Sequence, residues 1–163
     1  MTIEETFVTV SARRMGELMD RLERAVAKLT PEQVWMRASE NENAVGNLVL
    51  HLTGNVRQWI LSGLGGAEDR RVRDAEFEAR GGEDVRELMV RLRAVVQEAQ
   101  RVIGGMKAEE LMGRVVIQKT DVTKMEAVMH VLEHFSGHAF QVFFAAKMFT
   151  SGDLGFYAHL RSK

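Results

Sequence analysis

The segment His130-Val-Leu-Glu-His134-Phe-Ser-Gly-His138, within the stretch 123–148, decides the fold. Apolar residues recur through this stretch at spacings of three and four, which predicts a helix. They are Met125, Val128, Met129, Leu132, Phe135, Phe140, Phe143 and Phe144. Histidines four apart lie on one side of a helix, so the three imidazoles share a face. Such a pair offers a metal ion two nitrogens, and a third ligand must come from elsewhere.

Three other stretches carry the same helical period. They are residues 7–29, residues from an Asn41 or Asn43 cap to about 62, and residues from 83 to about 106. Four long helices with a long loop, residues 63–82, between the second and third predict an all-α four-helix bundle.

Shorter signals mark the connections. Thr30 and Pro31 end the first helix and begin a helical turn through about residue 36. Residues 113–121 contain β-branched residues between helix breakers, which predicts a short extended segment. Thr123 followed by Glu126 fits a capping box that opens the last helix. Residues 150–163 are polar and contain glycine, so we expect a tail or an edge element.

Composition narrows the class of protein. A chain of 163 residues suits a single domain, which we place over residues 1–163. A net charge of −1 gives no sign of general nucleic-acid or membrane-surface binding. No stretch is apolar enough to span a membrane, and the N-terminus is unlike a signal peptide, so we expect a cytoplasmic protein. Without cysteine, any thiol chemistry needs a thiol from a co-substrate.

The second predicted helix carries a polar stripe on an otherwise apolar surface, with Asn43, Asn47, His51 and Asn55 four residues apart. The asparagines suit a pocket lining or hydrogen bonds between helices equally well. A lone histidine such as His51 is more often an ordinary core residue than a metal ligand. Burying several imidazoles together without a shared partner costs free energy, however, and a metal ion removes that cost.

If the second and last helices are neighbours, His51 can meet the pair His134 and His138. Each step of four residues drifts about 40° around a helix, so three histidines on one helix would not all reach one ion. We expect His130 to be the one left out.

Arginines could recognise an anionic substrate. The candidates are Arg57, Arg70, Arg71 and Arg73, although a solvated loop explains the last three better. Residues 63–82 contain five glycines and are long for a connection, which suggests a lid over the pocket. In the competing interpretation, Arg71, Arg73 and Glu76 form a salt-bridged structural plug.

Three segments together resemble one known superfamily. They are Asn47-Leu-Val-Leu-His51-Leu-Thr-Gly-Asn-Val-Arg57-Gln-Trp59, Arg71-Val-Arg73-Asp-Ala-Glu76-Phe77 and His130-Val-Leu-Glu-His134-Phe-Ser-Gly-His138-Ala-Phe-Gln141. They look like the DinB-like superfamily, in a branch labelled as a domain of unknown function.

The resemblance implies a four-helix bundle, often a homodimer, with a metal bound by one histidine of the second helix and the HxxxH pair of the last. By position these ligands are His51, His134 and His138. Members include thiol-dependent S-transferases and metal-dependent hydrolase-like proteins. Where relatives often have Arg-Gly or Thr-Gly after the last histidine, this chain has Ala139 and Phe140 before Gln141.

Two functions stay open. The first is an enzyme whose divalent metal ion (zinc, nickel or iron) activates a low-molecular-weight thiol or water for transfer or hydrolysis on a small electrophilic substrate. The second is a non-catalytic, metal-binding dimeric stress-response or binding module. No residue is assigned a catalytic role. Candidates for the surroundings of the metal are Asn47, Asn55, Arg57, His130 and Gln141.

The last predicted helix also suggests the partner. It carries apolar residues around most of its circumference, more than one core needs. They are Val131, Phe135, Phe140, Phe143 and Phe144. We therefore expect part of this helix to bury against a second copy of the chain.

Overall fold

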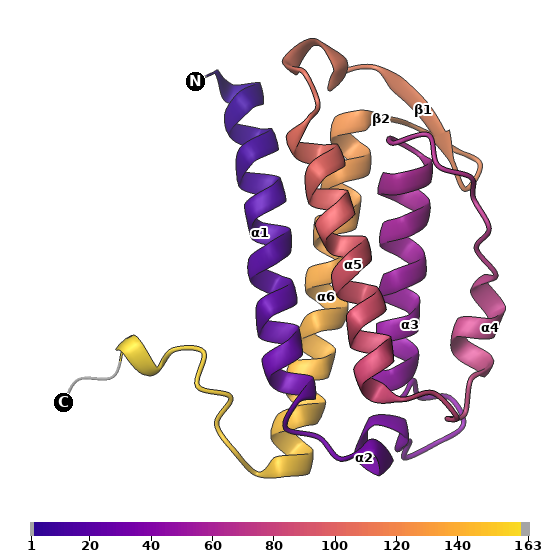
Figure 1. The fold of residues 1–163 in the computed structure, drawn as a ribbon, viewed down its shortest axis with the longest axis vertical. Coiled ribbons are helices and arrows are strands. Elements are labelled where there is room, and N and C mark those ends of the chain that lie inside the picture. Colours follow the sequence, from indigo (N-terminus) through magenta and orange to yellow (C-terminus); the bar gives the residue numbers. More distant parts are fainter. Residues whose placement is uncertain (1, 161–163) are drawn as a thin grey trace.

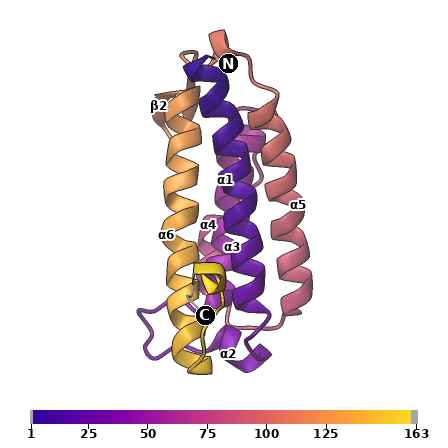
Figure 2. The ribbon, with the colours of Figure 1, turned by 90° about the vertical axis from the view of Figure 1, so that its left-hand side faces the viewer.

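The computed structural model describes residues 2–160, which are mostly helical with one small sheet. Four long helices lie side by side along one axis (Figures 1 and 2). They are α1 (Ile3–Val26), α3 (Val45–Val56), α5 (Val85–Gly104) and α6 (Lys124–Thr150). Helices α1 and α3 each pack against both α5 and α6. Helix α3 runs antiparallel to α6, so its residues meet α6 in reverse order (Figure 1).

The helix ends follow local rules where the cap residues are present. Thr30 caps α2 (Pro31–Trp35) and Thr123 opens α6 in a reciprocal capping box, as the sequence predicted. Thr30 also forms such a box, with Gln33, which was not predicted. The expected cap of the second helix is wrong. Helix α3 begins after Ala44 instead of after Asn41 or Asn43, and the Asn47 side chain accepts a hydrogen bond from the Ala44 N–H at 3.1 Å. A six-residue π-helical segment, η1 (Arg57–Ser62), continues α3 to the predicted end.

The core lies between the four long helices and takes one stripe from each. Its largest fully buried side chains include Met15, Met19, Leu22, Leu52, Ile60, Leu88, Leu92 and Phe135. Helix α6 is buried on one side only. Val131, Phe135 and Phe143 belong to the core, whereas Phe140 and Phe144 are 54% and 67% exposed.

The predicted extended segment forms half of a β-hairpin. Strand β1 (Arg114–Ile117) pairs antiparallel with β2 (Thr120–Thr123), with Arg114 opposite Thr123. The two turn residues, Gln118 and Lys119, both have positive φ (50° and 64°), the backbone that a tight two-residue hairpin requires. The second strand was not predicted, because Thr120–Thr123 is short and leads directly into the α6 cap.

The sequence predicts no regular structure in the long connection after η1, but part of this connection is helical. It contains the short helix α4 (Arg73–Glu78), which packs on α3. The connection brings the chain back along the molecule, so α5 runs parallel to α3 (Figure 1). Six residues are too few to show a helical period or to stay helical alone, so packing must stabilise α4.

The tail packs against the first helix. Leu154 is buried, and Arg24 donates hydrogen bonds to the carbonyl oxygens of Leu154 and Gly155 at 3.5 and 3.3 Å. The Phe156 ring meets the ring of Phe143 edge-on. The prediction for residues 161–163 lies outside the described residues. Within residues 2–160, every helix is too short or too polar to cross a membrane.

Candidate metal centre

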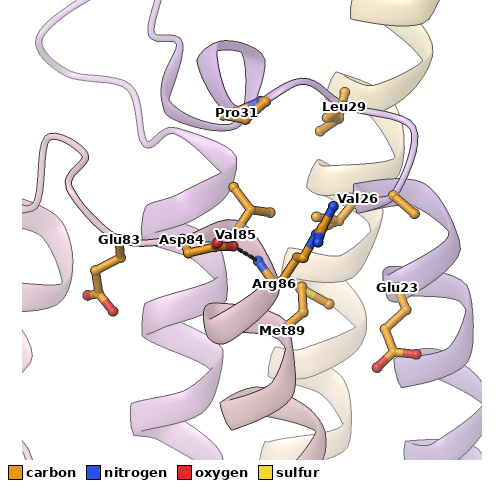
Figure 3. A pocket seen from close by; sticks show the side chains of 10 residues that line it. Glu23, Val26, Leu29, Pro31, Glu83, Asp84, Val85, Arg86 and Met89 are labelled. Atoms are coloured by element: carbon orange, nitrogen blue, oxygen red, sulfur yellow. Dashed lines mark hydrogen bonds between the residues drawn. The ribbon is translucent and has the colours of Figure 1, made fainter.

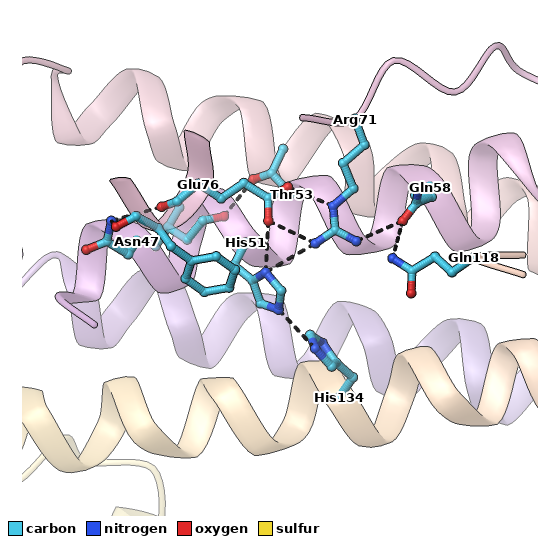
Figure 4. Close-up of polar contacts among 10 residues, drawn as sticks. Asn47, His51, Thr53, Gln58, Arg71, Glu76, Gln118 and His134 are labelled. Atoms are coloured by element: carbon cyan, nitrogen blue, oxygen red, sulfur yellow. Dashed lines mark hydrogen bonds and ion pairs between the residues drawn. The ribbon is translucent and has the colours of Figure 1, made fainter. Parts of the chain in front are cut away.

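Three histidines meet between α3 and α6. His51 comes from the middle of α3, and His134 and His138 stand one turn apart on α6. The Nε2 atoms of His51 and His134 are 3.1 Å apart (Figure 4), and the centroid of the His138 ring lies 5.0 Å from that of His51. One ring nitrogen from each histidine lies within 4.8 Å of the others, so the three can hold a metal ion.

This spacing is close to what a metal requires. Nitrogens bound tetrahedrally to zinc at 2.0–2.1 Å lie about 3.3 Å from one another. The pair His51 and His134 already has this separation. The ring nitrogen that His138 offers lies within 4.8 Å of those of His51 and His134.

A carboxylate holds the outer nitrogen of His51. The Nδ1 atom of His51 lies 2.8 Å from Oε2 of Glu76, which α4 supplies (Figure 4). Arg71 donates two hydrogen bonds to the same carboxylate, one from Nε to Oε1 at 2.7 Å and one from an η nitrogen to Oε2 at 2.8 Å. The three side chains are almost inaccessible to solvent, with exposures of 6% for His51, 10% for Glu76 and 4% for Arg71.

The charge on Glu76 decides where the His51 proton lies. Burial acts to raise the pKa of Glu76, but hydrogen bonds and positive charge from Arg71 and His51 outweigh it and hold that pKa below its usual value. An ionised carboxylate only accepts hydrogen bonds, so the 2.8 Å contact with Glu76 favours a proton on Nδ1 of His51. An η nitrogen of Arg71, which only donates, lies farther from Nδ1, at 3.1 Å. With the proton on Nδ1, the lone pair of His51 is on Nε2, the atom that faces His134. Carboxylate–histidine pairs of this kind accompany many metal sites.

The other two histidines are kept neutral. Burial, together with nearby His138, His51, His130 and Arg71, lowers the pKa of His134 to about 3. Burial also lowers the pKa of His138, although Gln141 opposes this shift. The neutral imidazole is the form that binds metals.

Gln141 orients His138. Its Oε1 lies 2.7 Å from Nδ1 of His138, so that nitrogen donates and Nε2 keeps its lone pair for the centre. Nδ1 of His134 is buried and has no hydrogen-bond partner within residues 2–160. The donor set therefore fits a divalent ion: neutral nitrogens, two of them with fixed tautomers, facing one small space.

His130 lies outside this group. Its ring stacks on Trp59 at 4.0 Å between centroids and stands 5.7 Å from the ring of His134. The expectation that His130 is the histidine left out agrees with this placement.

The other candidate residues have different places. Asn47 is fully buried, and its amide donates to the carbonyl oxygens of Glu76 and Ala79, so it anchors α4 instead of lining a pocket. Asn55 is buried, and its Oδ1 has no partner in the described chain. Arg57 is exposed, and its charge acts on Asp69 in the long connection.

The long connection is the segment whose structure differs most from the prediction. Arg71 was assigned to a solvated loop, but its side chain is buried in the ion pair with Glu76. The ion pair between Arg71 and Glu76 is one of the contacts expected in the competing interpretation, in which the loop forms a salt-bridged plug. Arg73, the third proposed member of the plug, lies over the ring of Phe77 at 4.8 Å. The apolar spacing carries no sign that Glu76 reaches His51, because 25 residues separate them.

Hollows open on the surface of residues 2–160, and two of them are distinguished by their linings. One, of about 600 Å³, is lined by Leu48, Gln141 and Phe144. Gln141 also contacts His138, but no histidine of the described chain lines this hollow. The other, of about 940 Å³, lies between the ends of α1 and α5 (Figure 3). It is lined by apolar side chains and by Glu23, Glu83, Asp84 and Arg86, with no histidine among them.

The fold and the site define a class: a mostly helical protein in which three histidines can hold a metal ion. The chain belongs to DUF1572, a family described as proteins of unknown function, whose profile matches residues 2–159. It is also similar to the crystal structure of a conserved protein from Enterococcus faecalis, with a TM-score of 0.75 and 15% identity over 93% of this chain and 99% of that one. This likeness shows the fold alone. No curated protein matches the chain.

Proposed function

We propose that the chain is a single-domain, DinB-like four-helix bundle that binds a divalent metal ion, zinc, nickel or iron, through His51, His134 and His138. The observation that carries this proposal is the convergence of three imidazole nitrogens from α3 and α6. Glu76 and Gln141 support it, because each holds the outer nitrogen of one histidine and leaves the inner one free for the ion.

We further propose that the protein is an enzyme of the S-transferase or hydrolase type. Three imidazole ligands leave coordination positions open, and a divalent ion held there would lower the pKa of a bound thiol or water. The chain's own residues shape and orient the site. A small electrophilic substrate would enter through the hollow lined by Gln141, Leu48 and Phe144, because Gln141 also contacts His138.

One observation favours the second candidate, a metal-binding module without catalysis. The carboxylate next to the histidines, Glu76, is already bound by Arg71 and His51 and is ionised, so it is poorly placed to take up a proton in a reaction. Glu133, which directly precedes His134 in the sequence, is exposed.

A screen separates the two candidates. Metal-loaded protein is incubated with low-molecular-weight thiols plus electrophilic acceptors, and in parallel with simple esters and amides. The enzyme hypothesis expects thiol transfer or hydrolysis that disappears in His51→Ala and in chelated protein. Tight metal binding with no turnover in either assay would favour the non-catalytic module.

We also propose a homodimer, in which a second copy covers the exposed side of α6. Phe140, Phe144 and Met148 stand four residues apart on that side and are 54–67% exposed. A stripe of large apolar side chains this exposed is typical of an interaction surface.

A further inference from the structure

His51 differs from the other two histidines in where its support comes from. Gln141 supports His138 from the same helix, three residues away, whereas Glu76 supports His51 from α4, in the long connection. Arg71, from the same connection, holds both oxygens of that carboxylate. The orientation of His51 therefore depends on a segment that must dock on α3. We call the pair Arg71 and Glu76 the clasp.

The docked segment is fixed at several points besides the clasp. The amide of Asn47 donates to the carbonyl oxygens of Glu76 at 2.9 Å and Ala79 at 3.0 Å. Arg37 also donates to the carbonyl oxygen of Ala79, at 2.9 Å. These bonds hold the end of α4 against the first turn of α3, and so bring the Glu76 carboxylate to the level of His51.

Gly54 lets the clasp lie flat on α3. A Cβ atom at this position would stand 2.0 Å from Oε1 of Glu76 and 2.9 Å from Nε of Arg71. Glycine inside a helix is less favourable than alanine, so its presence here needs a reason. Close approach of the clasp provides one. Gly54 is three residues from His51 and has no side chain, so its replacement removes no side-chain contact.

We propose that Glu76 and Arg71 are positioning residues for the metal centre, and that docking of residues 71–79 and metal binding at the three histidines strengthen each other. The Glu76 carboxylate, 2.8 Å from Nδ1 of His51, orients the ring so that Nε2 faces His134. Arg71 holds the carboxylate in place with two hydrogen bonds. This inference rests on the proposed metal site.

Coupling between two binding events is reciprocal. If the docked clasp raises metal affinity by some factor, bound metal must stabilise the docked segment by the same factor. Removing the hydrogen-bond partner of a metal-bound histidine typically costs about 10–100-fold in affinity. Bound metal would then stabilise the docked conformation of the long connection, whereas a linker that is not coupled to the site would be unaffected.

The first test is a titration of chelated protein with Zn²⁺ against a competing chelator. Glu76→Gln keeps the shape and removes the charge, and Gly54→Ala pushes the clasp away without changing any of its members. Each should weaken Zn²⁺ binding about 10–100-fold. Glu78→Gln, on the exposed side of the same short helix, is the matched control and should bind like wild type. Circular dichroism checks that each variant is helical, and Glu76→Gln decides the matter should Gly54→Ala fail to fold.

The second test is amide hydrogen exchange of residues 71–79 with and without Zn²⁺. Wild type should exchange more slowly with Zn²⁺, whereas His134→Ala, which keeps the clasp and loses a ligand, should not respond. Unchanged Zn²⁺ affinity in both Glu76→Gln and Gly54→Ala would overturn the inference and leave the metal site standing. A wild-type protein that binds no Zn²⁺, Ni²⁺ or Fe²⁺ would overturn the proposed function and this inference with it.

Discussion

The imidazole of His134 lies close to both other histidines, with its ring centroid 4.9 Å from that of His51 and 4.5 Å from that of His138. It faces His51 at 3.1 Å, and its own outer nitrogen is buried without a partner in the described chain. A buried polar atom without a hydrogen bond costs free energy, and a charged one costs more. The three histidines could therefore hold a positive ion, and two predictions follow from individual side chains.

Alanine substitution of any proposed ligand should abolish tight metal binding. His51→Ala, His134→Ala and His138→Ala each leave two nitrogens, too few for a stable site. His130→Ala should retain the metal, because its ring stacks on Trp59 outside the group. Elemental analysis after dialysis measures the content. Metal retained in His51→Ala but lost from His130→Ala would show that the ligands are assigned wrongly.

Metal-free protein should lose stability as the pH falls below about 6.5. The pKa of His134 is lowered to about 3 in the folded chain, so between that value and its ordinary value of 6.5 the unfolded chain binds the extra proton. Unfolding is then favoured by acid over this range. The lowered pKa values of His138 and Glu76 act in the same direction, for Glu76 only below about 4.5.

Thermal melts in the presence of a chelator, at pH 7.5 and pH 5.0, measure this effect. His134→Gln cannot take up the proton and should show a smaller fall in Tm between the two pH values than wild type. An equal fall in both proteins would contradict a neutral, buried His134 in the metal-free state.

At the scale of elements, α6 depends on its first turn, because the helix must begin at the right residue for its histidines to face α3. Thr123 accepts a hydrogen bond from the Glu126 N–H at 3.1 Å, and Glu126 accepts one from the Thr123 N–H at 2.7 Å. The same threonine ends strand β2 opposite Arg114. One residue thus joins the hairpin to the helix that carries two of the three histidines.

Loss of this cap should lower stability measurably. Thr123→Ala removes the side-chain acceptor and should cost about 1 kcal/mol. In a chain of this size such a loss lowers Tm by about 2–4 °C. Thr123→Ser keeps the hydroxyl and should stay closer to wild type, and differential scanning calorimetry compares the two. A full-sized loss in the serine variant would assign the effect to the missing methyl group instead of the cap.

At the scale of the whole molecule, the exposed stripe on α6 predicts the state of assembly. Wild type should have a mass of twice 18.4 kDa in light scattering at micromolar concentration. Replacing Phe140 and Phe144 with serine should give a protein of 18.4 kDa, because the apolar area that drives association is lost. Met129→Ser, at the other end of the same helix and 52% exposed, is the control and should stay dimeric. A wild-type monomer would remove the dimer proposal.

Local sequence determined the helices and their starts. A helical period is visible wherever one face is buried, which is why the long helices were predictable to within a few residues, although the predicted cap of the second was wrong. The caps Thr30 and Thr123 were predictable because their partners are three residues away. The shared face of His134 and His138 follows from their spacing alone. These features depend only on neighbours along the chain.

Only the tertiary structure decided how the site is completed. His51 meets His134 across 83 residues of sequence because α3 lies antiparallel beside α6. Glu76 reaches His51 because α4, a helix too short to show a period, is held in place by long-range hydrogen bonds to side chains such as Asn47. The sequence placed these residues in the right segments. Their contacts depend on how the segments pack, and no local spacing contains that information.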